Sequence, residues 1–232
     1  MTIITPFGGK IKIKAKGIRK TLSKNNGAVE LFTYADLVIV KGKSLDILAT
    51  ASIINPFLSV KNDLKKTATA YYFSELIDKL TEYRVENHQM FDLFSECLEY
   101  LDKETISGPK NPDSILLSYF ELNLLSYSGF SPEIEYCLHC HQKLKAEENH
   151  FSFSGGGVFC PKCKTSAKNS LPISPDILKL IRIILHHPLS SAIKIRVKEK
   201  TKTDLRQIVQ IFLEYIAERR FKSAKFLANI QR

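Results

Sequence analysis

Four of the five cysteines in this 232-residue chain form two closely spaced pairs. Cys137 and Cys140 make the first C-x-x-C pair, and Cys160 and Cys163 make the second after nineteen intervening residues. This spacing is typical of a tetrahedral zinc site, because each pair wraps a tight knuckle that points two thiolates at one ion. Four thiolates leave no open coordination position, so the predicted zinc is structural rather than catalytic.

Other interpretations of the cysteines are weaker. A redox-active C-x-x-C pair opens a helix beside a βαβ unit, and neither pair has that context. His139 and His141 flank Cys140 and could replace a cysteine as ligand, although a histidine inside a knuckle is more often exposed. The fifth cysteine, Cys97, lies on the inward face of a predicted helix and is interpreted as a buried core thiol.

The charge of the chain indicates a polyanionic partner. Its 34 basic and 24 acidic residues give a formal net charge of +10, which favours nucleic acid first and an anionic membrane surface second. No apolar run approaches the ~18 residues of a spanning helix, and the N-terminus lacks the features of a signal peptide. We therefore expect a cytoplasmic protein, in a reducing compartment where paired cysteines serve as metal ligands.

Residues 1–57 carry the pattern of short β-strands that suggests a small barrel. The segment 10–16, KIKIKAK, alternates Ile11 and Ile13 on one face with lysines on the other. Such a strand places positive charges ~6.6 Å apart, close to the phosphate repeat of an extended single strand. Further strands are predicted within 30–40 and 45–54, separated by a glycine-containing turn.

The first 29 residues contain no acidic residue, and their basic residues are the predicted DNA-binding set. This set is Lys10, Lys12, Lys14, Lys16, Arg19, Lys20 and Lys24. The alternative is a solvated edge strand whose lysines prevent strand pairing. A second basic alternation, from Lys194 to Lys202, is equally well explained as a surface linker or edge strand.

From about residue 60 the apolar period becomes helical. The first two helices are predicted from Asp63 or Asn62 to Leu80 and near 87–103. A strongly apolar helix follows within 115–128 and stops at Gly129. Two more are predicted from Ser174-Pro175 to about His186 and over about 203–221, and a short terminal helix closes the chain. The predicted fold is α+β. An N-terminal OB-fold at 1–58, expected to lack its first strand, precedes a helical domain at 59–232, and the zinc finger is inserted at 137–163.

Several motifs together resemble the bacterial recombination mediator family RecO. They are GKIKIKAKGIRK in the barrel, YFELNLLSYSGFSPEIEYC, the cysteine segment CLHCHQKL with FSFSGGGVFCPKC, and RRFKSAKFL near the end. The resemblance implies an OB-fold and a helical domain with a zinc finger. It also implies a protein that binds single- and double-stranded DNA, anneals complementary strands and, with RecR, loads RecA onto DNA coated by single-strand-binding protein. It implies no enzymatic activity and a nucleoid-associated location.

The sequence departs from this family in two places. Family members begin with roughly twenty further residues that include the first barrel strand, so we expect the functional protein to start upstream of Met1. The first knuckle of the family continues with glycine, where this chain has His141, which tolerates a left-handed backbone better than most residues. A ribosome- or RNA-associated protein with an OB-fold and a zinc ribbon is the alternative function, and strand annealing discriminates between the two.

Overall fold

A computed structural model of the chain describes residues 1–15, 27–104 and 114–230. The chain divides into two compact units, Met1–Ser107 with Phe226–Arg232, and Gly108–Lys225. The first unit begins with a sheet that helices follow, and the second is mainly helical, so the predicted α+β class is confirmed. The predicted boundary after residue 58 stays a prediction, although three helices after this boundary group with the N-terminal sheet.

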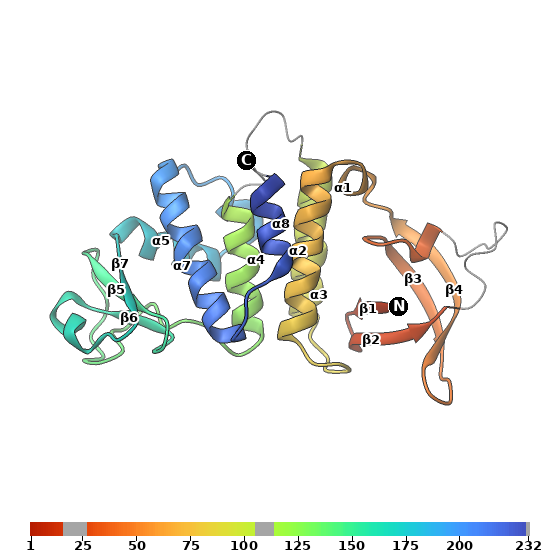
Figure 1. Cartoon of the computed structure of the whole chain (residues 1–232), viewed down its shortest axis with the longest axis horizontal. Helices are drawn as coiled ribbons and strands as arrows, with labels where there is room; N and C mark the ends of the chain where they lie inside the picture. The colour runs from red at the N-terminus through yellow and green to blue at the C-terminus, as the bar shows by residue number, and fades with distance from the viewer. Residues whose placement is uncertain (16–26, 105–113, 231–232) are drawn as a thin grey trace. The chain divides into compact units, whose positions relative to one another are not determined.

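The first unit contains a four-stranded sheet in the order β1-β2-β4-β3 (Figure 1). The strands are β1 (Thr2–Thr5), β2 (Gly9–Lys14), β3 (Tyr34–Val40) and β4 (Asp46–Asn55). β1 and β3 lie antiparallel to their neighbours, whereas β2 pairs with β4 in parallel over two residues. β1 precedes the lysine-rich strand, and the sequence analysis did not identify it because Thr2–Thr5 shows no alternation.

Helices α1 (Leu58–Asn62), α2 (Leu64–Leu80) and α3 (His88–Lys103) follow the sheet. The predicted cap of α2 is confirmed, since the Asp63 carboxylate accepts the Lys66 N–H at 2.9 Å. Cys97 of α3 is completely buried, as predicted for a core thiol. The buried face of α3 also contains Met90, Leu93, Leu98 and Leu101, whereas Phe91 and Phe94 are only half-buried.

The core of the second unit is α4 (Ser114–Tyr127), which packs against α5 (Pro175–His186), α6 (Leu189–Ala192) and α7 (Glu199–Ala217). α4 is followed by Gly129 at φ 88°, and the Ser174 hydroxyl caps α5, both as predicted. α7 begins four residues before its predicted start. The apolar residues of α7 begin only at Leu205, so periodicity does not predict the polar first turn of the helix. The negative charge of Glu199 stabilises this turn, because the N-terminus of a helix carries a partial positive charge.

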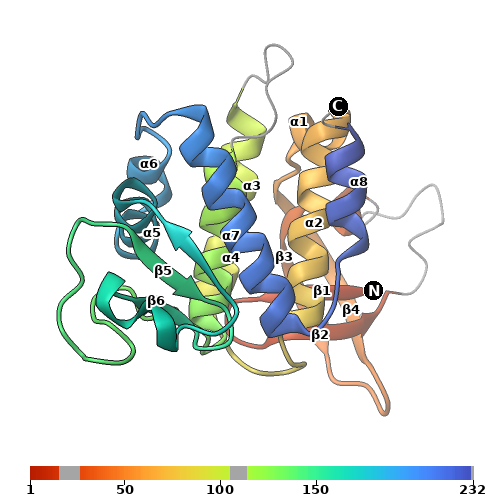
Figure 2. The same ribbon diagram turned by 60° about the vertical axis from the view of Figure 1, so that its left-hand side comes forward.

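A three-stranded sheet in the order β6-β5-β7 completes the second unit (Figure 2). It consists of β5 (Asn149–Ser152), β6 (Gly157–Phe159) and β7 (Ser170–Ile173), with the 3-10 helix η2 (Pro161–Ser166) after β6. The hairpin between β5 and β6 turns at glycines, and Gly156 has φ 66°. The last helix is α8 (Lys222–Ile230), and no described helix is long and apolar enough to cross a membrane.

Candidate metal centre and basic strand

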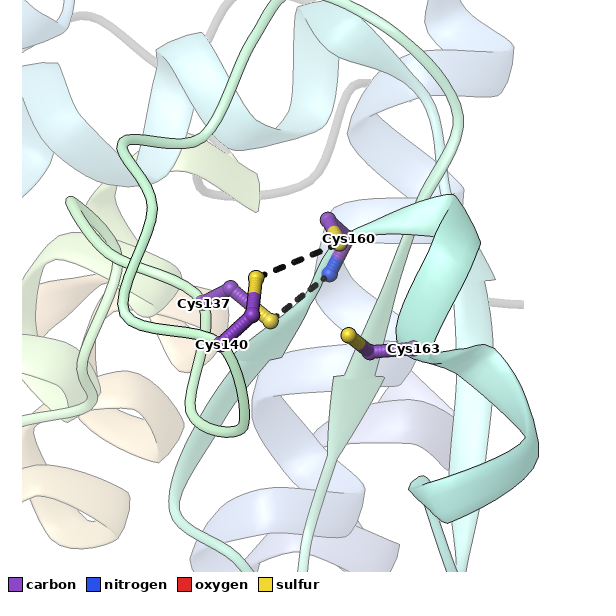
Figure 3. A group of neighbouring side chains, drawn as sticks. All are labelled: Cys137, Cys140, Cys160 and Cys163. Atoms are coloured by element: carbon purple, nitrogen blue, oxygen red, sulfur yellow. Dashed lines mark hydrogen bonds between the residues drawn. The ribbon is translucent and has the colours of Figure 1, made fainter.

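The four paired cysteines meet at one point, as their spacing predicts (Figure 3). Their sulfur atoms all lie within 4.8 Å of one another, and those of Cys140 and Cys160 are 3.8 Å apart. Four sulfurs bound tetrahedrally at ~2.3 Å from one ion stand ~3.8 Å apart, so the arrangement fits a metal site with four cysteine ligands. No disulfide links these cysteines.

Backbone hydrogen bonds shape the first knuckle. The Cys137 carbonyl accepts the His141 N–H at 2.9 Å, and the Cys137 N–H donates to the Gln142 carbonyl at 2.9 Å. His141 has φ 56°, which confirms that this position needs a left-handed backbone and that histidine supplies it. His139 and His141 are exposed, and the metal-ligating group in the described part of the chain comprises the four cysteines alone.

The second knuckle faces the first across the end of β6. The Cys160 N–H points at the Cys137 sulfur, 3.3 Å away, and the Leu138 N–H donates to the Val158 carbonyl at 3.0 Å. Pro161 then opens η2, and the Cys163 N–H donates to the Cys160 carbonyl at 3.0 Å. The two knuckles are therefore held face to face by the backbone of the finger itself.

The thiols differ strongly in acidity. Burial opposes ionisation of Cys137, but the backbone N–H groups of Cys140, Cys160 and His139 outweigh it and lower its pKa to about 6. Burial and the neighbouring thiols raise the pKa of Cys163 to about 12. In the protein alone, the cluster therefore favours a thiolate at Cys137 and opposes ionisation of Cys163. A bound dication would offset the repulsion among four thiolates.

The finger is also tied to two helices of its unit. The Ile134 carbonyl, just before the first knuckle, accepts two hydrogen bonds from the Arg182 guanidinium of α5, at 2.7 and 3.1 Å. Phe151 of β5 packs edge-on against Phe212 of α7, with ring centroids 5.2 Å apart. The finger sheet therefore has apolar support that does not depend on the cysteines.

Only part of the predicted basic face of β2 is exposed in the structure. Lys12 and Lys14 are exposed, and Ile13 faces the core. Lys10 is only 3% exposed, and its ammonium donates to the Asp78 carbonyl at 2.6 Å and lies 3.4 Å from the Asp78 carboxylate. Alternation alone places Lys10 with the other lysines, but the C-terminal end of α2 covers it. Lys16, Arg19, Lys20 and Lys24 lie outside the described residues.

The turn between α2 and α3 places two residues against the basic strand β2 that the sequence did not point to, Tyr83 and Arg84. The Arg84 N–H donates to the Lys10 carbonyl at 2.9 Å, and its guanidinium pairs with Asp46 of β4 at 3.1 Å. The Tyr83 ring lies against the Lys10 and Lys12 ammoniums, 4.3 and 4.7 Å from the ring centre. No periodic pattern marks this turn, so the sequence carried no signal for its place beside β2.

The other basic segments do not form strands. Residues 193–198 are irregular and lead directly into α7, where Lys202 pairs with Glu199 at 3.1 Å. The second alternation is therefore a surface linker and a helix start, one of the two forms expected. Its basic residues are Lys194, Arg196, Lys198, Lys200 and Lys202. Near the C-terminus, Arg220 lies 3.9 Å from Glu214 of α7.

Comparison with known proteins accounts for the whole chain. Residues 1–57 match the family described as Recombination protein O N terminal, and residues 61–225 match Recombination protein O C terminal. The DNA repair protein RecO of Dehalococcoides mccartyi strain CBDB1 is 32% identical over 231 residues, covering 100% of this chain and 88% of that protein. The DNA repair protein RecO of Bacillus subtilis strain 168 is 29% identical with the same coverage.

Proposed function

The chain belongs to the RecO family of DNA repair proteins, and on that premise we propose that it binds DNA during recombinational repair. The observation that carries the proposal is the pair of exposed lysines on β2, Lys12 and Lys14, which form no ion pair with any described residue. Unpaired lysines on a strand contact backbone phosphates without reading base sequence. Lys10 is left out of this set because Asp78 already neutralises it.

The finer activity follows from the family resemblance. We propose that the protein anneals complementary single strands and, together with RecR, helps load RecA onto DNA coated by single-strand-binding protein. This activity involves binding and release, and no covalent step. Strand annealing on DNA coated with single-strand-binding protein, with and without RecR, measures it directly. Faster annealing with this protein supports the proposal, and an unchanged rate contradicts it.

We further propose that Cys137, Cys140, Cys160 and Cys163 hold one structural Zn²⁺. Support comes from the donor set, because four thiolates suit a soft tetrahedral ion, and from sulfur separations close to those of such a site. The ion would neutralise the thiolates and close the loop between the two knuckles. Cys163, whose pKa is raised in the protein alone, would bind as thiolate.

The DNA-binding role of β2 is tested by the salt dependence of single-strand binding. Replacing Lys12 and Lys14 with alanine should weaken binding and flatten the slope of log affinity against log salt by up to ~0.7 for each phosphate that is no longer bound. Lys41 and Lys43, exposed in the turn after β3, provide a control with the same change in net charge. An equal effect in both double variants would mean that only the overall charge matters, and would remove β2 from the binding site.

A further inference from the structure

Single-strand binders combine a basic track with aromatic side chains on which bases stack. The N-terminal sheet and its loops offer few such side chains. Phe57 is 1% exposed, Phe32 packs against Tyr71 and Tyr34 against Phe91. The chain contains no tryptophan. Phe7, in the turn between β1 and β2, is the strongly exposed aromatic residue of this sheet and its loops, so the lysine strand needs a further aromatic partner if it is to hold more than one base.

Tyr83 meets this requirement from outside the strands. It lies in the turn after α2, is 41% exposed, and holds its ring against the ammoniums of Lys10 and Lys12. Tyr83 is thus both partly exposed to solvent and in contact with positive charge. An aromatic ring next to an exposed lysine offers a stacking surface and a phosphate contact within one nucleotide of each other.

The backbone fixes Tyr83 in this position. Lys10 and Tyr83 form a bridge of the parallel type, and the Arg84 N–H donates to the Lys10 carbonyl. Gly9 approaches the same turn so closely that a Cβ atom there would lie 1.9 Å from the Val85 carbonyl oxygen. Because the turn is already ordered against β2, a base that stacks on Tyr83 does not have to order it on binding.

The charges around Tyr83 are largely paired, and those left over favour an anion. Asp78 is shared by Lys10 and Lys79, and Asp46 pairs with Arg84. Glu86 lies 2.8 Å from His88. With the His88 imidazole counted as neutral, Glu82 and Glu86 are opposed by Lys12, Lys14 and the second lysine on Asp78, which leaves one net positive charge.

We propose that Tyr83 stacks on a base of single-stranded DNA whose phosphates contact Lys12 and Lys14. This inference rests on the proposed DNA binding and adds a named base-contacting residue from the helical part of the first unit. Phe7 extends the same surface. It is 76% exposed at the turn between β1 and β2, and its ring packs edge-on against His88 with centroids 4.8 Å apart.

The first experiment separates bases from phosphates. Binding of a thymidine oligonucleotide of about 12 nucleotides, within the site size of an OB-fold, is compared with that of an abasic strand of equal charge. The natural protein should prefer the strand with bases by about 5-fold to about 100-fold, the range for one stacked base. Tyr83→Leu should remove most of this preference and leave the salt slope unchanged, whereas Tyr83→Phe should keep the preference.

The second experiment observes stacking directly. Because the chain has no tryptophan, Tyr83→Trp introduces a unique fluorophore that keeps a stacking ring. Its emission should be quenched by the strand with bases and little changed by the abasic strand. Tyr215→Trp is the matched control, since Tyr215 on α7 has a similar exposed fraction of 46% and should respond to neither strand.

The outcomes distinguish this inference from the function on which it rests. Equal affinity of the natural protein for both strands, or a base preference that survives in Tyr83→Leu, overturns the role of Tyr83 while DNA binding stands. Failure of the natural protein to bind either strand overturns both proposals. Equal quenching of Tyr83→Trp and Tyr215→Trp also overturns the inference, because it indicates a response that is not local to the stacking site.

Discussion

The four-stranded and the three-stranded sheet of this protein are held by different interactions. The sheet of β1 to β4 is held by charged and backbone contacts from the C-terminal end of α2 and the turn after it, notably Lys10 with Asp78 and Arg84 with Asp46. The sheet of β5 to β7 is connected to the cysteine cluster and is packed through Phe151 against Phe212 of α7. The first sheet thus depends on close approach and charge, and the second on thiol chemistry and apolar packing.

The largest expected effect comes from removing a metal ligand. Cys140 is exposed, so Cys140→Ser changes little packing, and its effect should come through the metal. We expect loss of bound zinc and a local destabilisation of several kcal/mol, because the energy of metal binding contributes directly to folding. Metal analysis and hydrogen exchange should show fast exchange in both knuckles and unchanged protection in the sheet of β1 to β4.

Cys97→Ala is the matched control for that variant. Cys97 is buried in α3 and lies outside the cluster, so its loss should leave zinc content unchanged even where stability falls. Natural protein that contains no zinc when purified without chelators would refute the metal assignment. Loss of protection in β5 and β7 as well would show that the packing of Phe151 on Phe212 does not support the finger sheet.

The next prediction compares the cost in stability of replacing Gly9 of β2 with that of replacing Gly156, in the turn before β6. Gly9 and Gly156 both have positive φ, at 58° and 66°, but a Cβ on Gly9 meets the Val85 carbonyl whereas one on Gly156 meets nothing within 4 Å. Gly156→Ala should cost about 1–2 kcal/mol for the left-handed backbone. Gly9→Ala should cost about 3–4 kcal/mol, because overpacking adds to the same strain.

Urea unfolding of the two glycine variants measures this difference. Similar losses in the free energy of unfolding would show that the turn after α2 moves freely away from β2. That result would also weaken the fixed position of Tyr83, since the same turn carries both Tyr83 and Val85. A larger loss for Gly9→Ala supports close docking of the turn.

The smallest expected effect on stability comes from the ion pairs that Asp78 of α2 forms with Lys10 and Lys79. The Lys79 hydrogen bond, together with the charge of Lys10, lowers the pKa of Asp78 below its ordinary value of 3.8. A lowered pKa stabilises the folded state above pH 3.8, and this contribution is lost as the pH falls through the folded value. Lys10→Met should cost about 1 kcal/mol at neutral pH, because the partly buried Asp78 carbonyl loses its charged donor.

The pH dependence of that variant tests the role of the carboxylate. The difference in stability between the natural protein and Lys10→Met should shrink below pH 3.8, as Asp78 becomes protonated in both. Lys79→Met is the control, since its ammonium meets the same carboxylate at the exposed surface and should cost much less. A difference that stays constant down to acidic pH would mean that Lys10 acts only through the Asp78 carbonyl.

The sequence by itself determined the features that depend on near neighbours in the chain. The spacing of the cysteines brought all four together, and Asp63 and Ser174 capped the helices where predicted. The same holds for the left-handed His141. The caps and the left-handed turn are decided within a few residues by backbone geometry or a capping hydrogen bond, and the two cysteine pairs need only the short hairpin between them to meet. Local motifs and spacing therefore predict them.

Only the tertiary structure decided which lysines of β2 remain exposed. Alternation assigns Lys10, Lys12 and Lys14 to one side of the strand, but it contains no information about what covers that side. The end of α2 and the following turn, far along the chain from β2, cover Lys10 and bring Tyr83 against Lys12. Contacts at that separation depend on how whole elements pack, and a turn without periodic pattern gives no sequence signal of its partner.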